Sequence, residues 1–349
     1  MTAQTSQTPQ IPLSQKERLL KTLRKESVDR QPVICMGGMM NAAVVEVMRK
    51  TGHTLPAAHA DSDRMADLAE DVRMQTGFEN FGIPFCMTVE AELLGADIDL
   101  GTLECEPKIA KENFPSVEAV ELREVEAMVH SGRINVVVEA ARRIARDNPD
   151  TPVIASLTGP VSTAASIVDP ITFYKELRRN PDAAARVLDY VSELLAAFAA
   201  RLADAGVAAI AVADPSATGE ILGPKMFEAY ALRYNNLFAD RVHALGLPFV
   251  LHICGDLRTV NPLLPQLRSD ALSTDAMVSL PNIKREFPSI TTMGNLSTFA
   301  LEWDDEDKIR LMTRKLVDGG IDIISPACGL STSTRLAAIK AMTDEVKGK

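Results

Sequence analysis

The chain has 349 residues, and its 37 Lys and Arg against 47 Asp and Glu give a formal net charge of −10. A composition with 46% hydrophobic and 24% charged residues is typical of a globular protein. No apolar run reaches the roughly 18 residues that a membrane span needs. An acidic chain with one Trp and four Tyr offers neither a basic surface nor a stacking platform for nucleic acid. We therefore expect no membrane or nucleic-acid partner.

The amino terminus and the cysteines indicate the compartment. The first residues, MTAQTSQTPQ, are polar and lack the charged flank and apolar block of a secretory signal, and residues 1–12 are predicted to be a disordered tail. Five cysteines are an odd number, scattered through a large chain, which indicates reduced thiols. We expect a cytoplasmic protein.

Short apolar runs alternate with helical segments along the chain. A helix is predicted to start at Ser14, which is a good capping residue and is followed by leucines at helical spacing. A second helix is bounded by Pro181 and Gly206, and a third by Gly223 and Gly246. The predicted strands are residues 33–36, 81–85, 152–157, 207–213, 247–253, 271–274, 290–293 and 321–325.

This alternation predicts an α/β fold with a parallel sheet. Near-continuous apolar strands indicate burial on both faces, and eight of them are the number that closes a (β/α)₈ barrel. A doubly wound open sheet is the alternative, but the chain has no G-x-G-x-x-G after a strand and no G-x-x-x-x-G-K-[ST]. We expect one barrel domain over residues 13–349, with a charged insertion at about 95–148.

The candidate site begins with His252 and Cys254, at the end of the predicted 247–253 strand. Side chains two apart on a strand point to the same face, and the carboxyl ends of barrel strands carry the chemistry of barrel enzymes. Cys328 follows the 321–325 strand in the same kind of position. One His and two Cys form a three-ligand zinc set that leaves a fourth position open, which is the catalytic pattern.

A carboxylate could supply the fourth ligand. Asp275 ranks first, because it ends the strand that directly follows the one carrying His252 and Cys254; Asp214 and Glu220 are further candidates. The remaining cysteines and histidines are assigned to packing and to the surface or helix ends, respectively. These are Cys35, Cys86, Cys105, His53, His59, His130 and His243.

Several segments of the chain resemble a known family. They are DRQPVICMGG, GFENFGIPFCMTVEAELLGADIDLG from Gly77, GPKMFEAYALRY from Gly223, LHICG, MGNLS from Met293 and ISPACGLSTSTRLAAIKAM. On these segments the chain resembles the uroporphyrinogen decarboxylase superfamily and, within it, the zinc-dependent methylcobamide:coenzyme M methyltransferases. The resemblance implies a (β/α)₈ barrel with zinc held by His252, Cys254, Cys328 and Asp275, where the family commonly has Glu at the last position.

One departure argues against decarboxylase activity. True uroporphyrinogen decarboxylases carry an Arg-containing M-R-Q-A-G-R loop after the first strand, which binds substrate carboxylates. This chain has Met36, Gly37 and Gly38 there, followed by two more methionines and no cation. Carboxylates cannot be desolvated against such a loop without a severe cost. The loop suits the face of a neutral methyl-corrinoid better.

The resemblance implies that a methyl group moves from a methyl-Co(III) corrinoid, carried by a partner protein, to an acceptor thiolate such as coenzyme M. Asp275 would occupy the open zinc position and give way to the thiol, and Asp214 would orient substrate or ligand. Two alternatives remain at this point. One is a zinc methyltransferase that uses tetrahydrofolate or a homocysteine-like thiol, and the other is a non-catalytic corrinoid- or tetrapyrrole-binding barrel.

Overall fold

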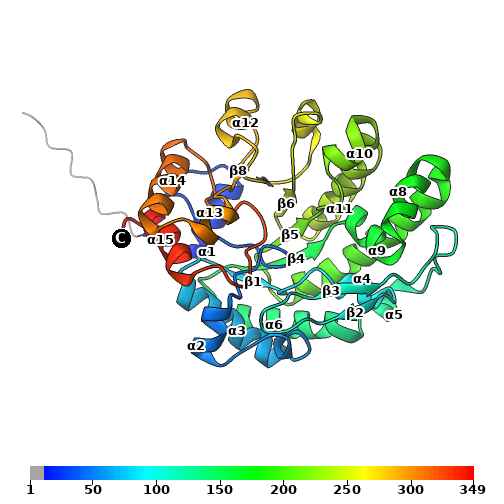
Figure 1. The fold of residues 1–349 in the computed structure, drawn as a ribbon, viewed down its shortest axis with the longest axis horizontal. Helices are drawn as coiled ribbons and strands as arrows, with labels where there is room; N and C mark the ends of the chain where they lie inside the picture. Colours follow the sequence, from blue (N-terminus) through cyan, green and yellow to red (C-terminus); the bar gives the residue numbers. More distant parts are fainter. Residues whose placement is uncertain (1–11) are drawn as a thin grey trace, which may run out of the picture.

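The computed structural model describes residues 12–349, so the predicted tail, apart from residue 12, lies outside the described residues. Its centre is a parallel sheet with helices packed around it (Figure 1). The strands follow one another in chain order. They are β1 (Phe81–Ile83), β4 (Val153–Thr158), β5 (Ala209–Ala213), β6 (Phe249–Ile253), β7 (Ala271–Thr274) and β8 (Thr292–Met293). This sequential order rejects the doubly wound alternative, in which the strand order reverses at a switch point.

The two remaining predicted strands connect the edges of this sheet. Ile323 forms a parallel bridge with Met293 of β8, and Ile324 forms one with Val33. On the other side of Val33, its carbonyl oxygen accepts a hydrogen bond of 2.9 Å from the amide of Glu79, two residues before β1. Backbone hydrogen bonds therefore lead from β8 through both segments to β1, as the predicted eight-stranded barrel requires.

Alternate strand residues fill the inside of the barrel. Ile154, Ala209, Ala211 and Val250 belong to one buried cluster, and leucines of α1 (Gln15–Leu23) complete that cluster. Helix α1 starts with a capping box between Ser14 and Glu17, so the predicted start is confirmed. Because the side-chain period of a strand is two, the same rows continue to His252 on β6 and Ser273 on β7, whose Cα atoms are register partners.

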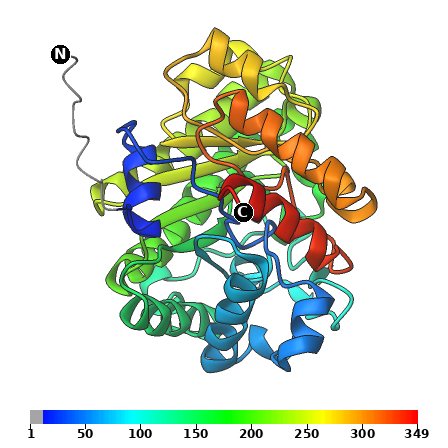
Figure 2. The same cartoon turned by 90° about the vertical axis from the view of Figure 1, so that its left-hand side faces the viewer.

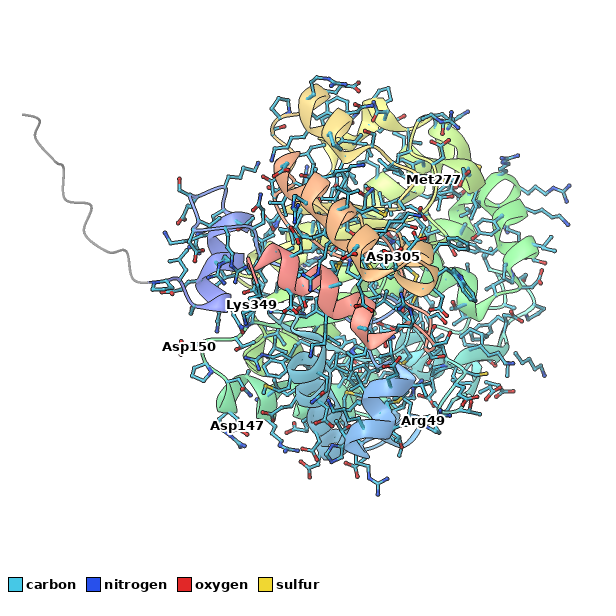
Figure 3. The ribbon with its side chains drawn as sticks, turned by 60° about the vertical axis from the view of Figure 1, so that its left-hand side comes forward. Arg49, Asp147, Asp150, Met277, Asp305 and Lys349 are labelled. Atoms are coloured by element: carbon cyan, nitrogen blue, oxygen red, sulfur yellow. The ribbon has the colours of Figure 1, made fainter. Side chains whose placement is uncertain are left out.

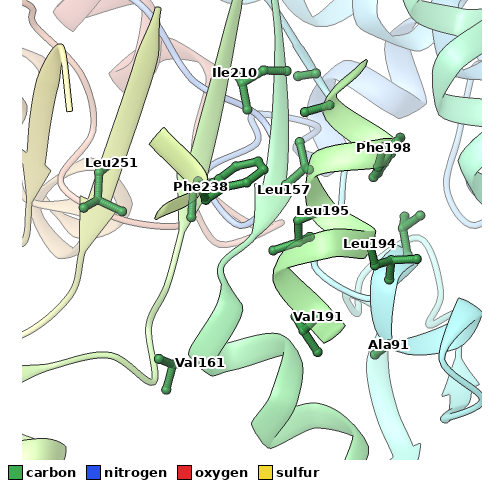
Figure 4. Close-up of a cluster of buried hydrophobic side chains, with 14 of the residues drawn as sticks. Ala91, Leu157, Val161, Val191, Leu194, Leu195, Phe198, Ile210, Phe238 and Leu251 are labelled. Atoms are coloured by element: carbon green, nitrogen blue, oxygen red, sulfur yellow. The ribbon is translucent and has the colours of Figure 1, made fainter. Parts of the chain in front are cut away.

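The intervening strand residues face the helices. Leu157, Ile210 and Leu251 are buried with side chains of α9 (Pro181–Asp204), as Figure 4 shows. The predicted helix between Pro181 and Gly206 is thus confirmed. This layer makes up most of the hydrophobic core.

The third predicted helix, from Gly223 to Gly246, is confirmed. It runs from the second part of α10 (Gly219–Met226) through a π-helical turn η2 (Phe227–Leu232) into α11 (Arg233–Ala244). Gly223 separates it from the short first part of α10, with φ 67° and ψ 167°, a conformation that favours glycine.

The other helices complete the outer layer. They are α2 (Val45–Thr51), η1 (Ala57–His59), α3 (Ser62–Thr76), α4 (Val89–Leu93), α7 (Pro160–Ile167), α8 (Pro170–Arg179), η3 (Asn261–Gln266), α12 (Leu280–Glu286), α13 (Thr298–Trp303), α14 (Glu306–Asp318) and α15 (Leu336–Val346). Helices α14 and α15 run side by side (Figure 2). Within residues 12–349 no helix combines the length and apolarity needed to cross a bilayer.

The segment predicted as an insertion contains two different parts. Strands β2 (Asp97–Asp99) and β3 (Lys108–Lys111) form an antiparallel hairpin outside the main sheet, and α5 (Val125–Met128) follows. Helix α6 (Gly132–Asp147), by contrast, buries one face against β1 and β4. Because α6 occupies the place of a normal crossover helix, the inserted part ends before Gly132.

Candidate functional site

The structure brings His252, Cys254 and Cys328 together at the carboxyl ends of the barrel strands. One ligand atom from each residue lies within 4.8 Å of the other two. His252 Nε2 is 3.1 Å from Cys254 Sγ, and the two sulfurs are 3.8 Å apart. His252 is fully buried, whereas both cysteines are half-buried. The imidazole therefore sits inside the barrel and the sulfurs lie toward its opening.

Ser273 orients the imidazole. Its Oγ is 2.9 Å from His252 Nδ1, so the ring turns its other nitrogen, Nε2, toward the sulfurs. Ser273 is fully buried on β7, beside His252. Sequence analysis missed this residue. The alternation of side chains along the predicted 271–274 strand could have indicated it. Ser273 lies two residues before Asp275 and therefore on the same face of that strand, next to the strand that carries His252.

A hydrogen bond joins the two cysteines, whose sulfurs are 3.8 Å apart. The hydrogen bond from Cys254 is the largest influence on Cys328 and lowers the pKa of Cys328, with further help from His252 and the amide of Gly329. The same hydrogen bond, followed by burial, raises the pKa of Cys254. Cys328 is therefore the first of the pair to become a thiolate, a form that attracts a cation.

These residues fit zinc. Tetrahedral zinc with Zn–S bonds of about 2.3 Å separates two thiolate sulfurs by about 3.8 Å. That is the distance between Cys254 and Cys328. Two thiolates and one imidazole are donors that zinc prefers, and the Ser273 contact supplies the outer hydrogen bond that usually fixes a ligand histidine.

The predicted fourth ligands lie around the trio without joining it. Asp275 is half-buried directly after β7, and its Oδ1 accepts a 3.2 Å hydrogen bond from the amide of Met277. Met277 itself is exposed on this loop (Figure 3). Glu220 accepts a 3.3 Å hydrogen bond from the amide of Asp256, just beyond Cys254. These two carboxylates therefore hold the loops that border the trio.

Asp214 points out of the barrel. Ala213 continues the inward row of β5, so the next side chain faces the helices. The carboxylate accepts hydrogen bonds from the Ser162 amide (2.8 Å), the Ser162 hydroxyl (2.6 Å) and Asn235 Nδ2 (3.0 Å). Burial raises the pKa of Asp214, and these hydrogen bonds oppose the rise. Asp214 thus ties β5 to α7 and α11, and its predicted role in substrate orientation stays a prediction.

The turn after the predicted 33–36 strand is tightly packed. Gly37 and Gly38 have φ of +90° and +60°. A Cβ on Gly37 would lie 2.5 Å from the Gly82 backbone, and one on Gly38 would lie 2.5 Å from Ser156 Oγ. Met36 is fully buried in the barrel interior. Both glycines are therefore required by close approach, and contact of this turn with a corrinoid stays a prediction.

A cavity of about 770 Å³ opens beside Cys328. Its walls come from Met39, from the segment joining β2 to β3, and from the loop after Cys328. The inserted hairpin thereby forms one side of the site. Sequence analysis treated this charged stretch only as an insertion, because no motif in it indicated contact with Cys328.

One sequence assignment is wrong: Cys105, assigned to packing, is exposed in the β2–β3 turn. His59 ends η1, in agreement with its assignment to the surface or a helix end, but it is only 1% exposed. Neither of its ring nitrogens has a hydrogen-bond partner. Burial and the charge of Arg133 lower the pKa of His59 to about 4. His59 is buried because η1 packs against α3, and the local sequence around His59 does not indicate this contact.

The other histidines and cysteines behave as predicted. Cys35 and Cys86 are buried. The ring nitrogens of the other three histidines lie near carboxylates at the surface, and the pairs are His53 with Asp71 (2.7 Å), His130 with Glu126 (3.2 Å) and His243 with Asp270 (2.8 Å).

Comparison with known proteins agrees with this architecture. The uroporphyrinogen decarboxylase (URO-D) family matches residues 14–348. The methylcobamide:CoM methyltransferase MtbA of Methanosarcina acetivorans is 31% identical over 95% of this chain and 97% of its own length. MtaA of Methanosarcina barkeri, which has the same named activity, is 29% identical over 94% and 96%.

Among solved structures, a methyltransferase from Methanosarcina mazei superposes with a TM-score of 0.90 and 29% identity, covering 96% of this chain and 99% of that chain. The family match spans nearly all of the described residues, and the similarity to each of these proteins extends over nearly the full length of both chains. The chain belongs to the uroporphyrinogen decarboxylase (URO-D) family and, within it, groups with the methyltransferases.

Proposed function

We propose that this protein is a zinc-dependent methyltransferase that moves a methyl group from a methyl-Co(III) corrinoid, carried by a partner protein, to an acceptor thiolate. The observation that carries the proposal is the meeting of His252 Nε2, Cys254 Sγ and Cys328 Sγ at the barrel opening. The named relatives act on coenzyme M, which makes this thiol the first acceptor to test. The five free cysteines suit a reducing compartment, so we place the protein in the cytoplasm.

His252, Cys254 and Cys328 would hold the zinc, and Ser273 would keep the imidazole in position. Bound zinc supplies a Lewis acid that lowers the pKa of a coordinated thiol. Asp275 is the proposed fourth ligand at rest. Its carboxylate would leave the Met277 amide to reach the trio and would withdraw when the acceptor arrives. The protein thus offers three fixed ligands and one replaceable ligand.

The reaction itself is a displacement at carbon. The acceptor thiol releases its proton to solvent, and a sulfur lone pair forms the new S–C bond with the methyl group. The Co–C bond breaks at the same time, and its electron pair stays on cobalt, so that Co(III) becomes the leaving Co(I). We propose that the Met36–Gly38 turn faces the corrinoid and that Asp214 acts as a positioning residue by anchoring β5.

The zinc content of the purified protein tests the proposal. We expect about one zinc per chain in the wild type and none in Cys328→Ala or His252→Ala, with the circular dichroism spectrum unchanged. Cys105→Ser is the matched control, because this thiol is exposed and outside the trio, and it should keep its zinc. Absence of zinc from the wild type, or full retention in Cys328→Ala, would overturn the proposed function.

A further inference from the structure

The cavity beside Cys328 carries an uneven set of charges. Four charged side chains line it: Asp99, Glu104, Glu106 and Lys108. Three of the four are acidic. Because the cavity also includes Cys328, its charge bears on whichever molecule approaches that sulfur.

Ion pairs neutralise most of these charges. Lys108 Nζ lies 3.5 Å from Asp99 Oδ2, and an arginine of α2, Arg49, lies 2.6 Å from Glu104 Oε1. Arg49 is at the surface in Figure 3. Glu106 differs, since no ion pair among residues 12–349 includes it. One uncompensated carboxylate is therefore left in the cavity.

Glu106 lines the same cavity as Cys328, where its side chain is open to solvent. Partial loss of its hydration raises its pKa; Asn41 opposes the rise and the Cys328 charge adds to it. Asn41 is buried and fixed, because its Nδ2 donates to the Gly38 carbonyl (3.0 Å) and its Oδ1 accepts from the Ala43 amide (3.0 Å).

The other charges near the sulfurs are also negative. The carboxylates of Asp275 and Glu220 border the loops beside the sulfurs, Asp275 directly after β7 and Glu220 on the amide of Asp256. The cation that lines the cavity, Lys108, is already paired with Asp99. An anionic acceptor would therefore enter a site whose net field repels it.

We infer that the acceptor is a small thiol whose tail is cationic or a neutral hydrogen-bond donor, and that Glu106 is the residue that selects it. This inference rests on the proposed function and narrows its substrate class. It separates this chain from its named relatives, whose acceptor, coenzyme M, is an anionic sulfonate. Glu106 acts on the tail of the acceptor and takes no part in the bond changes at sulfur.

Three thiols that differ only in their tail test the inference: cysteamine, 2-mercaptoethanol and 2-mercaptoethanesulfonate. With the zinc-loaded protein and methylcobalamin as donor, we expect the KM to rise in that order, by about tenfold or more between the first and the last. KM and kcat are compared separately, because differences in thiol nucleophilicity should change kcat, whereas the interaction with the tail should change KM. Binding of the S-methylated products, measured by calorimetry, should follow the same order without any turnover.

Glu106→Gln should reverse or abolish the order, raising the KM of cysteamine and lowering that of 2-mercaptoethanesulfonate. Glu121→Gln is the matched control, an exposed residue of the same inserted segment outside the cavity, and should keep the wild-type order. If 2-mercaptoethanesulfonate has the lowest KM in both wild type and Glu106→Gln, the inference is wrong while the proposed function stands. If no thiol is methylated by the zinc-loaded protein, the proposed function itself fails.

Discussion

The two ends of the barrel hold buried polar groups in opposite ways. At the amino end, Glu79 accepts from Arg18 (3.0 Å), from both terminal nitrogens of Arg30 and from the Val33 amide (3.0 Å), and Arg18 also binds Asp29. Each charged group of this network has a partner of opposite charge. At the carboxyl end, one ligand atom each of His252, Cys254 and Cys328 lies within 4.8 Å of the other two.

This difference separates stability from function. A paired buried network of charges holds elements together and has little left to bind, whereas converging thiol and imidazole groups are donors suited to a metal. Changes at the amino end should therefore alter stability alone, and changes at the carboxyl end should alter metal content and activity alone.

The largest expected effect is the loss of activity in Cys328→Ala. Removal of one ligand should lower methyl transfer at least about a hundredfold, because metal stabilisation of the transition state is worth several kcal/mol. The midpoint of thermal unfolding of the zinc-free protein should stay within a few degrees of the wild-type value. Steady-state rates and calorimetry on the same samples measure both quantities. If Cys328→Ala is unfolded, the carboxyl end also determines stability, and the proposed difference between the two ends is wrong.

At the amino end, Glu79→Gln should destabilise the fold by about 3 kcal/mol, because it leaves Arg18 and Arg30 without their buried countercharge. Urea unfolding measures this loss. Glu26→Gln is the control. Glu26 forms an exposed ion pair with Arg24, and its replacement should lower the free energy of unfolding by less than about 0.5 kcal/mol. Zinc content per folded Glu79→Gln molecule should equal that of the wild type; a loss of zinc would show that the two ends are coupled.

The same network predicts a pH dependence. Burial opposes ionisation of Glu79, but Arg30 and Arg18 prevail and hold its pKa below the ordinary 4.5. The stabilisation is therefore fully present above pH 4.5 and disappears as the pH falls through the lower folded-state pKa. The difference in unfolding free energy between wild type and Glu79→Gln should shrink in that window. A constant difference down to pH 3 would contradict this assignment.

Ser273→Ala sharpens the comparison at the carboxyl end. Loss of the hydroxyl that positions His252 should weaken zinc binding by about 10- to 100-fold, while activity at saturating zinc stays close to the wild-type value. Competition with a chromogenic chelator measures the affinity. Ser192→Ala is the control. It removes a different buried hydroxyl, which donates a hydrogen bond to a carbonyl of its own helix, and it should leave zinc affinity unchanged.

The smallest effect is expected for Asp275→Ala. If Asp275 is a replaceable ligand, its loss should reduce zinc affinity less than tenfold, and Asp275→Glu should restore it. Equal affinities in all three proteins would exclude Asp275 from the resting site and leave it as a loop residue bonded to Met277.

Much of the fold and part of the site could be predicted from local patterns. Apolar runs predicted the strands, and the period of two placed His252 and Cys254 on one face before any coordinates were known. Cys328 was predictable for the same reason, since it follows a strand whose carboxyl end must reach the same opening.

Other features arise only where distant segments meet. The outward direction of Asp214, the Ser273 contact and the burial of His59 depend on packing between elements far apart in the chain.

The sequence by itself determined the barrel and the gathering of His252, Cys254 and Cys328 at its opening, because strand periodicity and strand ends are local properties. Only the tertiary structure decided which charges surround those ligands. Glu106 lines the same cavity as Cys328, 222 positions later in the sequence, because the β2–β3 hairpin lies beside the loop that carries Cys328, and no local pattern encodes that arrangement.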